Sequence, residues 1–126
     1  MRFHGCLLRT ATEQLEGGDG EAIDPEGLDI SKLPRLSWNF DPRAPVGNVT
    51  RVWREDGRVY VEGVILPFAA KLVAGSVACA GVKGQHFSRS TGTIHGGTLY
   101  EVGLAPKNVD EGIPPITLEP DDALSG

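Results

Sequence analysis

The feature that most constrains the fold is a β-hairpin that the sequence predicts for residues 49–63. Asp56-Gly57 separates two runs in which apolar and polar residues alternate, and this dipeptide between alternating runs is one of the strongest short-range signals for a hairpin. Successive side chains of a strand point to opposite faces, so Val49 and Trp53 are expected on the same face. The sequence therefore places an antiparallel strand pair near the centre of the chain.

The rest of the chain predicts short strands joined by turns. Its 126 residues include 17 glycines and nine prolines, and glycine at roughly twice its average usage of about 7% favours turns over long helices. A small closed barrel would leave no sheet edge exposed. The predicted fold class is therefore mainly β, a small antiparallel β-barrel with one short helix and extended termini. Strands are predicted at residues 2–10, 33–38, 76–83 and 98–106, the helix at residues 67–75, and surface loops at residues 11–29 and 84–97.

The length of the chain fits a single domain, followed by a segment of different composition. From Lys107 onward the sequence contains three prolines and five carboxylates. Such a segment buries too little apolar surface to fold alone. We therefore expect a domain at residues 1–106 and an extended, acidic, Pro-rich tail at residues 107–126 that lies along a partner.

Charge and composition exclude several classes of partner. The formal net charge is −5 and the isoelectric point is near 5.1, which disfavours a nucleic-acid-binding surface. No apolar run approaches the roughly 20 residues that cross a bilayer, and the apolar stretch at the N-terminus is too short for a signal peptide. We expect synthesis in a host cytoplasm and no membrane partner.

The cysteines and histidines do not predict a metal or cofactor site. Cys6 and Cys79 lie far apart and match no zinc spacing, and reduced thiols are the expected state of cysteines in a cytosol. The three histidines are scattered along the chain and share no helical face. No cofactor and no metal are therefore expected.

Four motifs follow one another along the chain: RFHG at residues 2–5, GDGEAIDPEGL at residues 18–28, WNFDP at residues 38–42 followed by PVG at residues 45–47, and the central hairpin. Their order and spacing resemble the prohead (capsid maturation) proteases of tailed phages, the HK97-type family whose fold is shared with the herpesvirus assemblins. The resemblance covers about residues 2–106 and implies the barrel of that family.

Two departures from the family decide what the resemblance implies about activity. In that family a histidine activates a nucleophilic serine, and the matching positions here are Phe40 and Cys79; the third, acidic position is Glu101. A phenyl ring has no lone pair to accept a proton. An unassisted thiol has a pKa near 8.5 and is only a few per cent thiolate at pH 7. The resemblance therefore implies a vestigial site and a chain that is not an enzyme.

The predicted function is that of a non-enzymatic phage virion protein, a capsid decoration or minor capsid protein in virus assembly. Its expected partner is the major capsid protein, bound at the outer surface of the shell through strand edges, the 84–97 loop and the termini, and self-association on the capsid is a further contact that this function allows. Aromatic side chains are enriched at the centres of interfaces. The interface candidates are Trp38, Trp53, Tyr60, His86, Phe87 and His95.

Two other functions remain open from the sequence. The chain is alternatively a compact, divergent maturation protease that uses Cys79 with His86 or His95 as the base. It is alternatively an inactive protease-like scaffold that leaves the capsid after assembly. Trp38, Trp53 and Tyr60 also fit a simpler role as core residues or cross-strand pairs.

Overall fold

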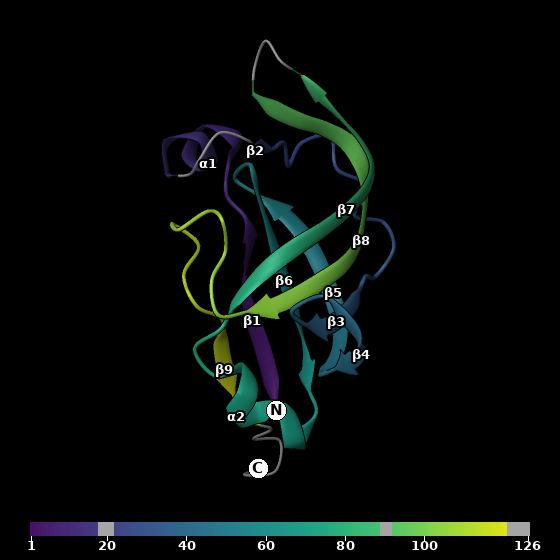
Figure 1. Cartoon of the computed structure of the whole chain (residues 1–126), viewed down its shortest axis with the longest axis vertical. Helices are drawn as coiled ribbons and strands as arrows, with labels where there is room; N and C mark the ends of the chain where they lie inside the picture. Colours follow the sequence, from purple (N-terminus) through teal and green to yellow (C-terminus); the bar gives the residue numbers. More distant parts are fainter. Residues whose placement is uncertain (18–21, 89–91, 121–126) are drawn as a thin grey trace.

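The strands of the computed structural model form two sheets (Figure 1), and the structure describes residues 1–17, 22–88 and 92–120, excluding the side chains of residues 85–88. Sheet 1 has the order β5-β6-β1-β9. Sheet 2 is built around β8, which pairs with β7 on one side and with β2 and β3 on the other, and β4 follows β3. The strands are β1 (Arg2–Leu8), β2 (Ala22–Ile23), β3 (Arg35–Trp38), β4 (Asp41–Pro45), β5 (Gly47–Glu55), β6 (Arg58–Ile65), β7 (Val77–Ser88), β8 (Thr93–Ala105) and β9 (Thr117–Glu119), and the helices are α1 (Ala11–Gly17), η1 (Pro67–Ala69) and α2 (Ala70–Val73).

The predicted central hairpin is confirmed as β5 and β6. Asp56 and Gly57 have φ values of 51° and 73°, the left-handed conformation that a two-residue turn of type I′ requires. The register shifts between Val49 and Arg51, so β5 contains a bulge there. Val49 is therefore buried while Trp53 lies on the outer face beside Tyr60. The prediction that Val49 and Trp53 share a face is wrong, because the bulge changes the alternation.

The predicted loop at residues 84–97 is also wrong, because most of this segment belongs to β7 and β8. The two strands pair in antiparallel fashion from Val77↔Ala105 to Ser88↔Thr93, and Figure 1 shows them extending together beyond the rest of sheet 2. Polar and glycine residues dominate this part of the ribbon. The apolar alternation that identifies a half-buried strand is therefore missing, although the backbone pairing continues.

The mainly β fold is confirmed, and the described strands do not close into a barrel. Sheet 1 ends at β5 and β9, and sheet 2 ends at β7 on one side and at β2 and β4 on the other. The core includes residues of both sheets, among them Phe3 and Val61 from sheet 1 and Val102 and Leu104 from sheet 2. The helix predicted at residues 67–75 is present as η1 and α2. Within the described residues, each helix is too short or too polar to traverse a lipid bilayer.

The described part of the expected tail contributes to sheet 1 and to the core. Ile113 and Ile116 are buried, and the Ile116 amide donates a hydrogen bond of 2.9 Å to the Ser76 carbonyl. After Ile116, β9 pairs with β1 through Thr117↔His4 and Glu119↔Arg2. Thr117–Glu119 therefore form one edge strand of sheet 1, and the segment before them packs into the core through Ile116.

Helix α1 lies within a segment that was predicted as a loop. The Glu13 amide donates to Thr10 Oγ1, and the Thr10 amide donates to Glu13 Oε1, both at 3.2 Å. This reciprocal pair is a capping box, and the Thr-x-x-Glu spacing that forms it is visible in the sequence. Arg58 on β6 donates two hydrogen bonds of 2.9 Å to the Glu13 carboxylate. Glu13 therefore both caps α1 and fastens it to sheet 1.

We predict that Glu13→Gln reduces stability above pH 4.5 and that this loss disappears in acid. The hydrogen bonds from Arg58, and then those from Thr10, lower the pKa of Glu13 from 4.5 to about 2. Because the folded-state pKa is depressed, the stabilisation is present above the unfolded-state value and is lost as pH falls toward about 2. Urea unfolding midpoints of both proteins between pH 6 and pH 2 measure this convergence.

Glu16→Gln, an exposed position in the same helix, is the matched control and should leave the midpoint nearly unchanged at each pH. A difference between wild type and Glu13→Gln that stays constant from pH 6 to pH 2 would contradict the assigned role of the carboxylate.

Candidate functional site

The three positions that the resemblance implies lie together on the outer face of sheet 2. Cys79 on β7 pairs with Gly103 on β8, and Gly81 pairs with Glu101. Because residues two apart on a strand share a face, these four residues form one square, with Cys79 and Glu101 at diagonal corners. Phe40, in the turn between β3 and β4, covers the two glycine corners.

The Phe40 ring fits this face because neither glycine has a Cβ. A Cβ added at Gly103 would lie 2.7 Å from the nearest ring carbon, and one added at Gly81 would lie 3.0 Å from the ring. Asn39 and Phe40 have φ values of 55° and 61°, and the left-handed region is unfavourable for a bulky residue by about 1–3 kcal/mol. The Asn39 amide donates to the Leu104 carbonyl at 2.8 Å. This bond and the contact with the glycines hold the ring in place, and 37% of the residue remains exposed.

Cys79 is a free, half-buried thiol. Burial raises its pKa, so the thiol is protonated at neutral pH. The nearest polar contact of its Sγ is the Lys107 carbonyl at 3.8 Å, which is an acceptor and not a base of useful strength. The environment of Cys79 therefore disfavours the thiolate.

The structure does not bring His95 or the backbone of His86 near Cys79. His95 lies eight residues along β8 from Gly103, the partner of Cys79, which is about 26 Å at about 3.3 Å per residue. His86 lies seven residues along β7 from Cys79, about 23 Å by the same rise, and its side chain is outside the described part. Neither histidine therefore lies close enough to Cys79 to act as its base.

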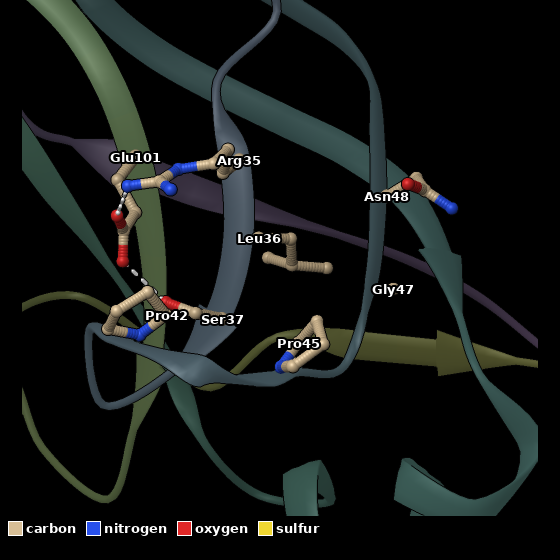
Figure 2. A pocket seen from close by; sticks show the side chains of 8 residues that line it. All are labelled: Arg35, Leu36, Ser37, Pro42, Pro45, Gly47, Asn48 and Glu101. Carbon is tan, nitrogen blue, oxygen red and sulfur yellow. Dashed lines mark hydrogen bonds and ion pairs between the residues drawn. The ribbon is translucent and has the colours of Figure 1, made fainter.

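Glu101 is buried and both of its carboxylate oxygens are occupied. Ser37 Oγ donates to Oε2 at 2.6 Å, and Arg35 Nη2 donates to Oε1 at 3.0 Å; Figure 2 shows both side chains reaching the carboxylate from β3. Ser37 is itself buried, whereas the Arg35 side chain is 68% exposed. A buried carboxylate needs such partners. Glu101 is therefore held by β3 and is not directed at the thiol.

Sequence reasoning missed Arg35 and Ser37. The parallel register Arg35↔Glu101 and Ser37↔Gly103 places both side chains beside Glu101, and this pairing joins segments 66 residues apart. The only local signal is the alternation of polar and apolar residues at positions 35–38. That alternation indicates a strand face but does not identify its partner strand.

A pocket of about 190 Å³ adjoins this carboxylate (Figure 2). It lies between β3, β4 and the start of β5, and its walls combine polar groups with proline rings. The lining residues are Arg35, Leu36, Ser37, Pro42, Pro45, Gly47, Asn48 and Glu101.

The other interface candidates are distributed over several elements. Trp53 and Tyr60 stack on the outer face of sheet 1 with ring centroids 5.7 Å apart, and the Arg51 guanidinium lies 4.4 Å from the Trp53 ring. Trp38 packs against the core. The side chains of His86 and Phe87 lie outside the described residues.

His95 belongs to a hydrogen-bonded chain that sequence reasoning did not identify. Its Nε2 lies 2.6 Å from Thr93 Oγ1, and its Nδ1 lies 3.1 Å from Asp24 Oδ2. This order of groups is that of a nucleophile, a base and an acid. Thr93, however, is only 6% exposed, so its hydroxyl is not presented to a substrate. The chain of bonds instead fastens the segment after β2 to β8.

No group of three or more histidine, cysteine or acidic residues in the described ranges is arranged to hold a metal ion.

We predict that the contact between Phe40 and Gly103 appears as coupling in a double-mutant cycle. Gly103→Ala places a methyl group against the ring and should destabilise the wild-type chain by about 1–3 kcal/mol. In a Phe40→Ala background the same change should cost much less, because the ring that it strikes is absent. Urea unfolding of the four proteins measures the coupling.

Gly27→Ala is the control, because a Cβ there meets its nearest atom at an ordinary 3.5 Å and should change stability by less than about 0.5 kcal/mol. Additive effects of Gly103→Ala and Phe40→Ala would exclude the contact.

Comparisons with known proteins found no match to this chain among family models, curated proteins or solved structures.

Proposed function

We propose that this chain is a non-enzymatic phage virion structural protein, a capsid decoration or minor capsid protein that binds the major capsid protein on the outer surface of the shell. The observation that carries the proposal is the Phe40 ring, which covers the two glycines between Cys79 and Glu101. In the resembling family this position holds the base. Under this proposal, the two sheets are an open form of the barrel found in that family.

The chemistry of the neighbouring groups supports a site without catalytic function. Burial raises the pKa of Cys79, and the ring beside it accepts no proton. Glu101 accepts hydrogen bonds from Arg35 and Ser37. These contacts support the proposal that the three positions do not produce a nucleophile.

The proposed contacts with the shell would use exposed apolar side chains, which the described surface carries on several elements. Contacts of this kind that are individually weak become strong when they are repeated over a shell. The exposed large apolar residues include Leu33, Phe40, Val64, Phe68, Leu72, Tyr100 and Val109.

The first test is quantitative mass spectrometry of purified mature particles of the phage that encodes the chain. We expect the chain to be present at a simple ratio to the major capsid protein, as a component that occupies lattice positions requires. Presence in immature particles together with absence from mature ones would favour the departing scaffold. If the chain is absent from mature particles, and the Cys79→Ala variant leaves the capsid precursor unprocessed, the chain would be the maturation protease.

We further predict that Phe40→His lowers the pKa of Cys79. Histidine tolerates a positive φ better than most residues, and an imidazolium beside a thiol favours the thiolate. The pH dependence of iodoacetamide alkylation, measured in a Cys6→Ser background, reports this pKa. Phe40→Leu is the control, because it changes the ring without adding a base.

An alkylation profile that is identical in Phe40→His and Phe40→Leu would show that residue 40 does not occupy the base position. That result would remove the main support for a vestigial site.

A further inference from the structure

The outer edge of β5 is the longer of the two free edges of sheet 1. The sheet has the order β5-β6-β1-β9, and β6 is the only described strand that pairs with β5. β5 has nine residues, whereas β9 at the opposite edge has three. An unpaired edge strand presents a row of N–H and C=O groups to which another chain can pair. The edge of β5 is therefore the place on sheet 1 where a further strand can add.

Two features limit this edge to the second half of β5. The start of the strand lines the pocket beside β3, so that part of the edge faces sheet 2. The register shift between Val49 and Arg51 then makes Thr50 an extra residue and interrupts the ladder. Beyond the bulge, residues 51–55 pair with β6 without a further shift. Residues 51–55, here called the edge segment, are therefore the part that a further strand can reach in a regular register.

The turn fixes which backbone groups of the edge segment point outward. Glu55 and Arg58 flank the two-residue turn and are direct partners, and such flanking residues form a hydrogen-bonded pair. Hydrogen-bonded and non-hydrogen-bonded pairs alternate along an antiparallel ladder. Trp53 therefore also faces β6 with its backbone groups, and those of Val52 and Arg54 point away from β6. Among the described residues, none outside sheet 1 is hydrogen-bonded to the backbone of Val52 or Arg54.

The side chains of these two residues do not extend across the edge. Val52 packs against the core, and Arg54 shares its side of the strand because the two residues alternate with Trp53. Arg54 Nε and Nη2 donate to the carbonyls of Pro25 and Leu28 at 2.9 Å and 2.6 Å. The guanidinium is therefore held by the segment after β2, and the outward N–H and C=O groups are left for a partner strand.

A second copy of the edge segment fits this edge in one antiparallel register. We propose that two copies of the chain associate through their edge segments, with Trp53 opposite Trp53 of the second copy. In this register Val52 of each copy lies opposite Arg54 of the other. The outward groups of both residues then meet as hydrogen-bonded pairs, with about four bonds in all. The two copies of sheet 1 become one continuous sheet.

The outer side chains of the edge segment are self-complementary in the same register. Trp53 stacks with Tyr60 on the outer face, and Arg51 lies over its ring. Pairing Trp53 with its copy places Arg51 opposite Glu55 on both sides of the two-fold axis. These positions form the non-hydrogen-bonded pairs, in which side chains come closest across a ladder. Within the described residues, neither Arg51 nor Glu55 forms an ion pair.

The charges around the edge segment are mixed, which favours a copy over a strongly charged partner. Arg58 on β6 is bonded to Glu13, and Glu62 is the ladder neighbour of Arg51. A two-fold pair places the Arg51 end of one segment beside the acidic Glu55 end of the other. The charged residues of the segment and its surroundings are Glu13, Arg51, Arg54, Glu55, Asp56, Arg58 and Glu62.

The first test is sedimentation velocity of the full chain from about 10 μM to about 1 mM. We expect a monomer–dimer equilibrium in this range, because a short edge buries less than the about 1,200 Å² of a stable complex. Arg51→Glu and Glu55→Arg should each weaken the dimer about tenfold, because each sets like charges opposite one another at both ends of the segment. Combining the two changes restores the opposite charges and should recover the dimer.

Lys71→Glu is the matched control, since Lys71 is an exposed lysine on α2 and not on sheet 1. It should leave the dimer unchanged.

Amide hydrogen exchange of the full chain, followed by NMR, tests the register itself. In the monomer the outward N–H groups of Val52 and Arg54 should exchange rapidly, whereas those of Trp53 and Glu55, which face β6, are protected. Pairing of two edge segments covers the outward groups. Exchange at Val52 and Arg54 should therefore slow about tenfold as the concentration rises through the dimer transition, with little change at Trp53 and Glu55.

A chain that stays monomeric up to about 1 mM would overturn the proposal. A dimer that leaves the exchange of Val52 and Arg54 unchanged, or that Lys71→Glu weakens as much as Arg51→Glu does, would overturn it as well. The proposal does not depend on the virion role. These readouts involve no capsid, so their failure is separate from a failure of that role.

Discussion

The structure depends most on the backbone ladder between β7 and β8. This ladder has a core side, where Ala78, Val102 and Leu104 are buried, and an outer side, where Cys79 and Glu101 lie. Because alternate residues of the same two strands serve the two sides, the packing of the core fixes the relative positions of the outer residues. The core therefore fixes the spacing of Cys79 and Glu101 on the outer side.

The parts of the fold that local chemistry dictates were predictable from the sequence. The Asp56-Gly57 turn specifies the central hairpin, and the apolar spacing of residues 67–75 specifies the helical turn that follows it. The capping box of Thr10 and Glu13 carried an equally local signal for α1. The part of β7 and β8 at residues 84–97 gave no such signal. Its residues are mostly polar or glycine, so the strands are paired through backbone hydrogen bonds without the apolar alternation that identifies a strand.

The candidate site was predictable only in part. The positions Phe40, Cys79 and Glu101 come from the resemblance, and the structure places them on one face. Arg35 and Ser37, which satisfy the charge of Glu101, depend on the parallel pairing of β3 with β8. That pairing joins distant segments, and sequence spacing carries no information about it. The bulge in β5 that places Trp53 on the outer face is a similar case, since a single extra residue in a ladder leaves no pattern of its own.

The pairing of β9 with β1 has a consequence for the order of folding. Arg2 and Glu119 are partners in the ladder, so β1 gains its outer neighbour from a segment that follows all the other described strands. Contacts this distant in the chain carry a large loop-closure cost and slow the folding step that forms them. Until Glu119 emerges, the backbone groups of one side of β1 remain open to pairing with other chains. One edge of β1 therefore stays open after β5 and β6 have been synthesised, and an unpaired strand edge is a site for pairing with another chain.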